Sequence, residues 1–143
     1  MKQISLTLTL LLCAALSRDL SAETVLVVNK NNPITSLSKA QVKKILMGQQ
    51  AKWPSGAPVS VMLTAPGSPE RKKAIADICG MTENDFTTWF LKANFQGQSV
   101  QAPKNMPSSQ AIVQITQLVP GAFAFVSQAD VTPAVKVVSI GGE

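Results

Sequence analysis

The sequence contains no histidine and no tyrosine, and only 5% of its 143 residues are aromatic. Histidine is the usual general base near neutral pH, the commonest side-chain ligand of transition metals and the partner of nucleophilic serine or cysteine. Acidic residues are also few, and Glu83 and Asp85 are best explained as first-turn helix charges rather than as a hydrolytic pair. The composition therefore argues against an enzyme, and we expect no catalytic residue, no metal site and no cofactor.

Only two cysteines occur, and Cys13 falls in a segment with the features of a secretory signal peptide. Lys2 gives this segment a charged start, residues 4–16 form a mostly apolar run too short to span a bilayer, and small residues precede Glu23. We therefore expect residues 1–22 to be a cleaved signal peptide. Export to the periplasm follows from it, with no stable membrane span in the mature chain.

The mature chain, residues 23–143, keeps a single cysteine, Cys79, and so must be held together by a hydrophobic core rather than by a disulfide. About 120 residues are enough for one such core and too few for two ordinary domains. Removing Lys2 and Arg18 leaves 11 of 13 basic residues, removing Asp19 leaves 7 of 8 acidic residues, and the net charge becomes +4. Because this charge is mild and scattered, we expect no nucleic-acid partner.

Strand-like and helix-like patterns alternate along the mature chain, which favours an α/β fold. Apolar or alternating runs predict strands at 24–28, 58–63, 122–126 and 135–140. Capping residues and helical periodicity predict helices at 39–47, from Pro69 to Gly80, from Thr82 onward and at 109–119. No helix separates the last two strands, so we expect a mixed sheet.

Several large side chains are expected to be structural. The helix after Thr82 places four residues on one face, which should anchor the core rather than hold a cofactor: Phe86, Trp89, Phe90 and Ala93. Trp53, in a turn, is more often a core plug than a ligand platform, and Cys79 lacks the neighbours that make a thiol reactive.

Two further expectations concern the second half of the chain. The helix at 109–119 should present Ile112, Ile115 and Val119 on one side. The polar residues 96–107 should form a long surface loop.

Three segments together resemble periplasmic phosphate-binding proteins of ABC transporters. Residues 36–53, with Leu37-Ser38, Gln41, Gly48 and Trp53, are similar to the Leu-Ser-x-x-Gln…Gly-x-x-x-x-Trp segment of that family. A strand then leads into Gly67-Ser68-Pro69-Glu70, at the place of the family's Ser-Gly-Thr phosphate loop. Residues 120–125, Pro-Gly-Ala-Phe-Ala-Phe, resemble the family's Pro-Gly-Ala-Ile-Gly-Tyr strand. The resemblance implies a single-lobe, periplasmic-binding-protein-like (type 2) domain, an α/β fold with a mixed sheet flanked by helices.

The same resemblance implies a site for phosphate or a similar small oxyanion. Helix starts at Ser68 and at Ser108 and Ser109 offer unpaired N–H groups and the positive end of the helix dipole. A serine hydroxyl can donate there, and Arg71 can supply a bidentate fork. The alternative interpretation is that Ser68 is only an N-cap and that residues 71–73 are a solvated face.

Two functions remain open at this point. The first is an exported solute-binding-like protein that captures an oxyanion for transport or sensing. The second is a non-enzymatic interaction module that retains one lobe, has lost solute binding, and docks against a protein partner or forms a homodimer. The second gains support from Pro69, which has no N–H to donate, and from Glu70, which brings a negative charge toward an anion site.

Overall fold

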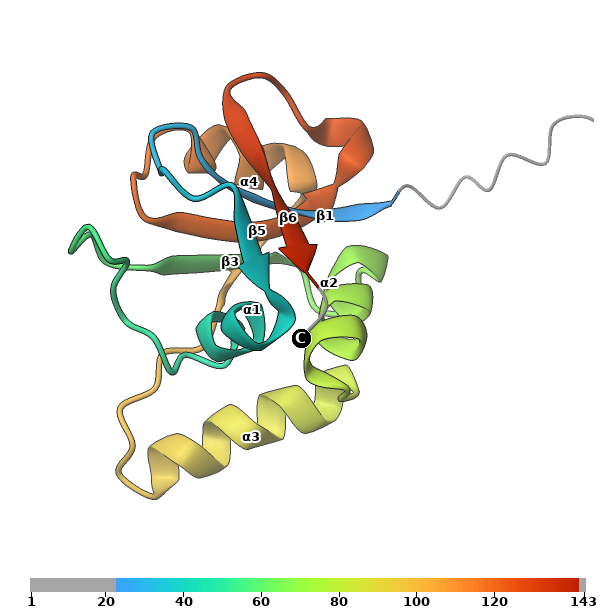
Figure 1. The fold of residues 1–143 in the computed structure, drawn as a ribbon. Coiled ribbons are helices and arrows are strands. Elements are labelled where there is room, and N and C mark those ends of the chain that lie inside the picture. The colour runs from blue at the N-terminus through green and yellow to red at the C-terminus, as the bar shows by residue number, and fades with distance from the viewer. Residues whose placement is uncertain (1–22, 142–143) are drawn as a thin grey trace, which may run out of the picture.

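The structure is a computed structural model that describes residues 23–141. The predicted signal peptide, residues 1–22, lies outside the described residues. Within residues 23–141 the chain forms six strands and four α-helices, with a π-helical turn (η1) after α2 and a 3-10 turn (η2) after β5. Figure 1 shows how these elements are arranged. In chain order they are β1 (Thr24–Asn29), β2 (Ser36–Ser38), α1 (Lys39–Leu46), β3 (Ser60–Thr64), α2 (Pro69–Ala74), η1 (Ile75–Cys79), α3 (Glu83–Phe95), β4 (Lys104–Met106), α4 (Ser109–Thr116), β5 (Ala122–Ser127), η2 (Gln128–Asp130) and β6 (Val135–Gly141).

The strands form one mixed sheet in the order β2-β6-β1-β5-β3-β4. β1 runs antiparallel to both of its neighbours, β5 and β6. The other pairs, β2 with β6 and β3 with both β4 and β5, are parallel. The prediction of a mixed sheet is confirmed, but not for the expected reason. β5 and β6, which no α-helix separates along the chain, are not neighbours in the sheet and run parallel to each other on either side of β1.

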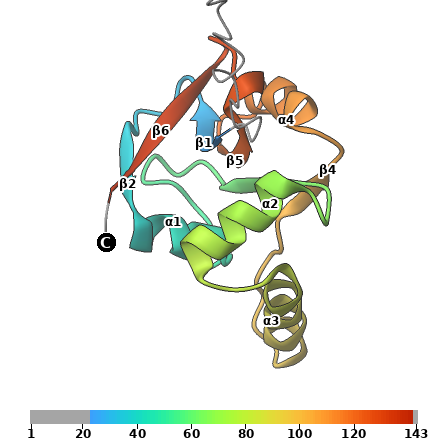
Figure 2. The same cartoon turned by 90° about the vertical axis from the view of Figure 1, so that its right-hand side faces the viewer.

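The sheet is covered on both faces because alternate strand residues point to opposite sides. Leu26 and Phe125 belong to one cluster, which packs against residues of α1, α2, η1 and α3. Val27 and Ala124 belong to the other, which packs against Ile112 of α4. Figures 1 and 2 show α1 and α2 on the first face and α4 on the second, with α3 extending away from the sheet.

The residues expected in the core are largely found there. Phe86, Phe90 and Ala93 are buried, and Trp89 is half-buried with its ring stacked edge-on against Phe90. Trp53 is buried, and its Nε1 donates to the carbonyl of Gly121 at 2.9 Å, as expected of a core plug.

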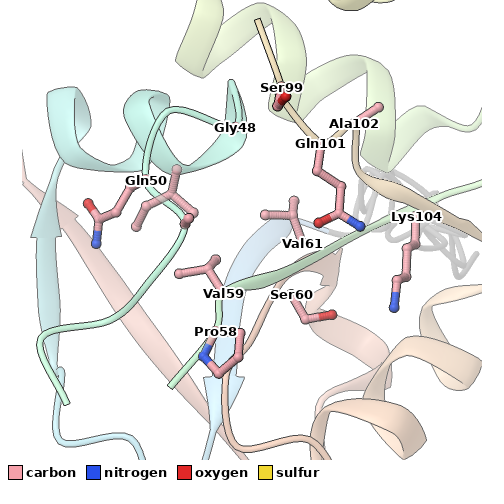
Figure 3. A pocket seen from close by; sticks show the side chains of 12 residues that line it. Gly48, Gln50, Pro58, Val59, Ser60, Val61, Ser99, Gln101, Ala102 and Lys104 are labelled. Atoms are coloured by element: carbon pink, nitrogen blue, oxygen red, sulfur yellow. The ribbon is translucent and has the colours of Figure 1, made fainter. Parts of the chain in front are cut away.

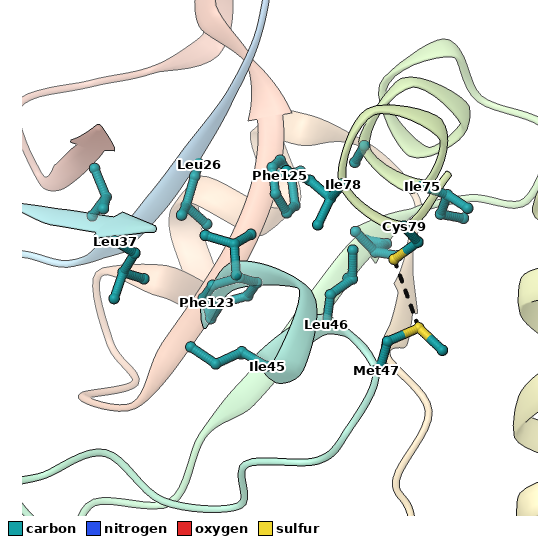
Figure 4. Packing of buried hydrophobic residues seen from close by; sticks show 14 of the residues in the cluster. Leu26, Leu37, Ile45, Leu46, Met47, Ile75, Ile78, Cys79, Phe123 and Phe125 are labelled. Carbon is teal, nitrogen blue, oxygen red and sulfur yellow. Dashed lines mark hydrogen bonds between the residues drawn. The ribbon is translucent and has the colours of Figure 1, made fainter. Parts of the chain in front are cut away.

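Cys79 ends the π-helical turn in the larger cluster. Its Sγ lies 3.6 Å from Met47 Sδ (Figure 4). Burial raises the pKa of the Cys79 thiol to about 11, and Lys43 lowers it only in part. The prediction of a buried structural thiol is confirmed.

Two short strands were not predicted. The segment 96–107 is a loop only in part, because residues 104–106 form β4 alongside β3. β2, residues 36–38, pairs with β6 at the opposite edge. Both are edge strands of three residues, which are too short for an alternating pattern to be recognised in the sequence.

The inner face of α4 also differs from the prediction. The buried residues are Ser109, Ile112, Val113 and Thr116, whereas Ile115 is 37% exposed. The helix ends at Thr116 rather than at residue 119. The buried side chain of Asn29, at the end of β1, donates to the carbonyls of Thr116 at 2.9 Å and Gln117 at 3.3 Å. These bonds satisfy carbonyls that a helix end leaves free.

Candidate functional site

The predicted oxyanion-binding residues gather where two neighbouring parallel strands, β3 and β4, end. β3 leads into α2 on one face of the sheet, and β4 leads into α4 on the other (Figure 2). The chain therefore leaves adjacent strands toward opposite faces, which makes this edge a topological switch point. In open α/β sheets, ligands bind outside the carboxyl ends of the strands at such a point.

Arg71 lies at the centre of this edge and is only 6% exposed. Its Nη1 donates to Asn105 Oδ1 at 2.7 Å and lies 3.4 Å from the carbonyl oxygen of Thr64. The guanidinium thus joins α2 to the ends of β3 and β4. The interpretation of residues 71–73 as a solvated face is wrong for Arg71, because it shares the inner helix face with Ala74 and Ile78, whereas Lys72 and Lys73 are exposed.

A carboxylate from the start of α3 contacts the same guanidinium. Glu83 Oε1 lies 2.7 Å from Arg71 Nε, and both Glu83 oxygens lie 3.0 Å from the backbone nitrogen of Gly67. The two side chains are 7% and 20% exposed, so both charges are largely removed from water. Removing one partner of such a pair leaves an uncompensated charge, which costs about 3–5 kcal/mol. Arg71 therefore requires an anion at this position.

Ser68 occupies the N-cap position of α2, but its side chain makes no capping hydrogen bond. Its hydroxyl is instead hydrogen-bonded to the hydroxyl of Thr64. Ser68 is therefore the N-cap residue, as the alternative interpretation expected, but its side chain does not cap the helix. The first turn of α2 is left without a side-chain cap and carries Glu70 and Pro69.

The two serines at the start of α4 have different surroundings. Ser108 is exposed and caps the helix, accepting from the backbone N–H of Ala111 at 3.1 Å. Ser109 is buried, and its hydroxyl accepts from the backbone N–H of Ser127 at 3.0 Å. Ser108 follows Asn105 by three residues, so their Cα atoms lie within about 11 Å of each other. The structure thus brings Ser68, Arg71 and Ser108 to one edge, while the hydroxyl of Ser109 points toward β5.

A surface hollow of about 320 Å³ lies at the other end of β3. Ser60 and Val61, at the start of β3, contribute to its floor, and Gly48, Gln101 and Lys104 form part of its rim (Figure 3). None of the four predicted site residues lines it. The hollow and the switch-point edge are therefore separate features of the molecule.

Residues 23–141 contain neither a membrane-spanning helix nor a cluster of metal-binding side chains. No helix within residues 23–141 is long and apolar enough to cross a membrane. Within the same residues, no cluster of three or more cysteine or acidic side chains is arranged to hold a metal ion.

The mixed six-stranded sheet with helices on both faces matches the periplasmic-binding-protein-like fold of solved structures. A protein from Clostridium perfringens described as a phosphate ABC transporter substrate-binding protein, solved with bound phosphate, matches with a TM-score of 0.66 and 23% identity, over 85% of this chain and 46% of that one. An ABC-type phosphate transport receptor from Vibrio cholerae matches with a TM-score of 0.58 and 18% identity, over 83% and 46%. A PstS protein from Borrelia burgdorferi matches with a TM-score of 0.63 and 14% identity, over 83% and 47%.

These likenesses establish the fold, and the chain spans about half the length of the solved structures that it matches. No protein-family model matches the sequence, and no curated protein matches it. The resemblance predicted from the sequence motifs is therefore confirmed at the level of the fold.

Glu83 was not predicted as part of the site, and Asn105 was expected only within the surface loop at 96–107. Asn105 accepts from Arg71, and Glu83 contacts it from another helix. The first-turn position of Glu83 predicted only an interaction with its own helix dipole. Glu83 and Gly67 are 16 residues apart, and no local pattern in the sequence signals their contact.

Proposed function

We propose that this protein is a non-enzymatic solute-binding-like protein that captures a small oxyanion of the phosphate class at the carboxyl ends of β3 and β4. One observation carries the proposal: a largely buried arginine lies at a switch point of the sheet, next to the starts of two helices on opposite faces. Arg71 can offer a bidentate fork, and the start of α4 offers free backbone N–H groups. Ser68 and Ser108 can add hydroxyl donors.

The solved structures of the same fold support this choice of ligand. Two of them are described as phosphate-transport proteins, and one of these was solved with phosphate bound. This chain spans about half their length, so the donors described here are those of one lobe. The protein would pass the bound oxyanion to a transporter, or would sense the concentration of the oxyanion.

Residues 1–22 have the features of a signal peptide, which supports a periplasmic location for this activity. We propose that they direct export and are removed, so that the domain acts in the periplasm from Glu23 onward. N-terminal sequencing of the protein recovered from the periplasm tests this part of the proposal, and a first residue other than Glu23 would contradict the proposed cleavage.

The ligand is tested by a thermal-shift titration with phosphate and sulfate at fixed ionic strength, with chloride as the control. A ligand that binds only the folded state stabilises it by about 2.7 kcal/mol at 100 times its dissociation constant. We expect phosphate to raise the melting temperature, Ser108→Ala and Arg71→Lys to reduce the shift, and Lys73→Ala, an exposed residue of the same helix, to leave it unchanged. No shift at millimolar phosphate would contradict the proposal.

A second candidate function, docking against another copy of the chain, is favoured by a different observation. Leu91 and Phe95, one turn apart on α3, are 67% and 95% exposed. Large apolar side chains that share an exposed helix face are typical of interaction surfaces. Sedimentation equilibrium tests it: a concentration-dependent dimer that Phe95→Ser weakens supports docking, and a monomer at all concentrations contradicts it.

A further inference from the structure

We propose that the Glu83 carboxylate is a resident anion of the oxyanion site, and that an external oxyanion binds by displacing it from Arg71 and Gly67. The inference rests on the proposed function and adds a form of regulation to it. In the structure the Glu83 side chain occupies the contacts with Arg71 and Gly67 that the ligand would use. Ligand binding therefore includes the departure of this side chain.

Glu83 contacts the kinds of group that a bound oxyanion contacts: it forms an ion pair with Arg71, without hydrogen-bond geometry at Nε, and accepts from the N–H of Gly67. Its oxygens meet a guanidinium nitrogen at 2.7 Å and a backbone N–H at 3.0 Å. Arginine and backbone amides are also the donors that recognise phosphate oxygens in proteins. A carboxylate and an external oxyanion therefore compete for the same donors.

Charge makes this competition unavoidable. Arg71 is the one cation in these contacts, and Glu83 already neutralises it. An oxyanion added beside Glu83 would place two anions on one cation in a region shielded from water, where their repulsion is strong. Removing both anions would leave Arg71 buried and unpaired. Each state of the site therefore holds one anion, either Glu83 or the ligand.

The geometry also lets Glu83 leave without moving the fold. Glu83 is the first residue of α3, and its side chain is 20% exposed against 7% for Arg71. Rotation of the glutamate side chain toward solvent breaks only its contacts with Arg71 and Gly67. Arg71 keeps its hydrogen bond to Asn105 at 2.7 Å and stays in place for the incoming ligand.

The test compares phosphate affinity in the purified protein and in two variants by calorimetry at fixed ionic strength. Glu83→Gln keeps the shape and one acceptor oxygen but removes the competing charge. Asp85→Asn removes the same charge from an exposed residue of the same helical turn and serves as the matched control. We expect the phosphate dissociation constant of Glu83→Gln to fall at least about tenfold, since one charge-assisted competitor is lost, and that of Asp85→Asn to stay unchanged.

A second variant tests displacement through stability. Glu83→Ala leaves Arg71 without a counterion and should melt at a lower temperature than the wild type. Acetate or phosphate should then restore more of its melting temperature than either ion adds to the wild type. Equal shifts in the two proteins would overturn the proposal.

The outcomes distinguish failure of the displacement of Glu83 from failure of the proposed phosphate binding. If the wild type binds phosphate and Glu83→Gln binds it equally well or more weakly, Glu83 is not a competitor and the proposed function stands without it. If neither protein binds phosphate, the proposed function fails and the inference fails with it.

Discussion

At the scale of single residues, Gly121, just before β5, lies in close contact with the segment that leads into β3. A Cβ built there would lie 1.7 Å from the carbonyl oxygen of Pro58, and the carbonyl of Gly121 accepts from both Ser60 and Trp53. Gly121→Ala should therefore force the start of β3 away and reduce the free energy of unfolding by about 3 kcal/mol. Urea denaturation measures the loss.

The matched control for this substitution is Gly141→Ala. A Cβ at Gly141 would lie 3.9 Å from the nearest heavy atom, which is ordinary van der Waals contact. A similar loss of stability in both variants would contradict the argument from close approach.

Cys79 should make stability depend on pH at the alkaline end. Its thiol titrates near 9.0 in the unfolded chain, whereas burial raises the pKa to about 11 in the folded protein. Between these values the unfolded chain has released the proton that the folded chain still holds. Stability should therefore fall as pH rises from about 9 to about 11. Cys79→Ala should flatten this part of a urea-denaturation profile, and an identical slope in the variant would contradict the assignment.

At the scale of elements, Asn29 ties the end of β1 to the end of α4. Its amide donates to two carbonyls of the last helical turn, and its Oδ1 accepts from the backbone N–H of Asn31. Asn29→Ala leaves buried carbonyls without these donors and should lower the free energy of unfolding by about 2 kcal/mol. Asn31→Ala, an exposed asparagine two residues away, should change it little. Equal losses in the two variants, measured by urea denaturation, would contradict a specific role for Asn29.

The elements that could be predicted from the sequence are those with a local signal. Ser38 and Gln41 form the reciprocal hydrogen bonds of a capping box, and Thr82 caps α3 through the N–H of Asp85. Buried strands such as β1 and β5 could be predicted because their apolar residues are contiguous. β2 and β4 could not, because they are strands only through pairing with β6 and β3.

At the scale of the whole molecule, the candidate site could be predicted only in part. Ser68 and Ser108 were identified because each begins a helix, and Arg71 because it lies in the first turn of one. The convergence of β3, β4 and their helices depends on strand order, which the sequence does not specify locally. The carboxylate on Arg71 was not predicted for the same reason, since α3 must pack beside α2 before Glu83 and Gly67 can meet.

The switch-point edge and the hollow are two separate features of the molecule. The switch-point edge holds a buried cation and helix starts, whereas the hollow near Gly48 and Gln101 lies at the opposite end of β3. We propose that phosphate is recognised at the switch-point edge and not at the hollow.

The most direct test of this claim is a ¹H–¹⁵N NMR titration of the protein with phosphate at constant ionic strength. We predict saturable shifts of the backbone amides of Gly67, Ser109 and Gln110 and of the Asn105 side-chain amide, with the amides of Gly48 and Gln101 unmoved. Saturable shifts confined to Gly48, Gln101 and Lys104, or no saturable shift at all, would contradict the account.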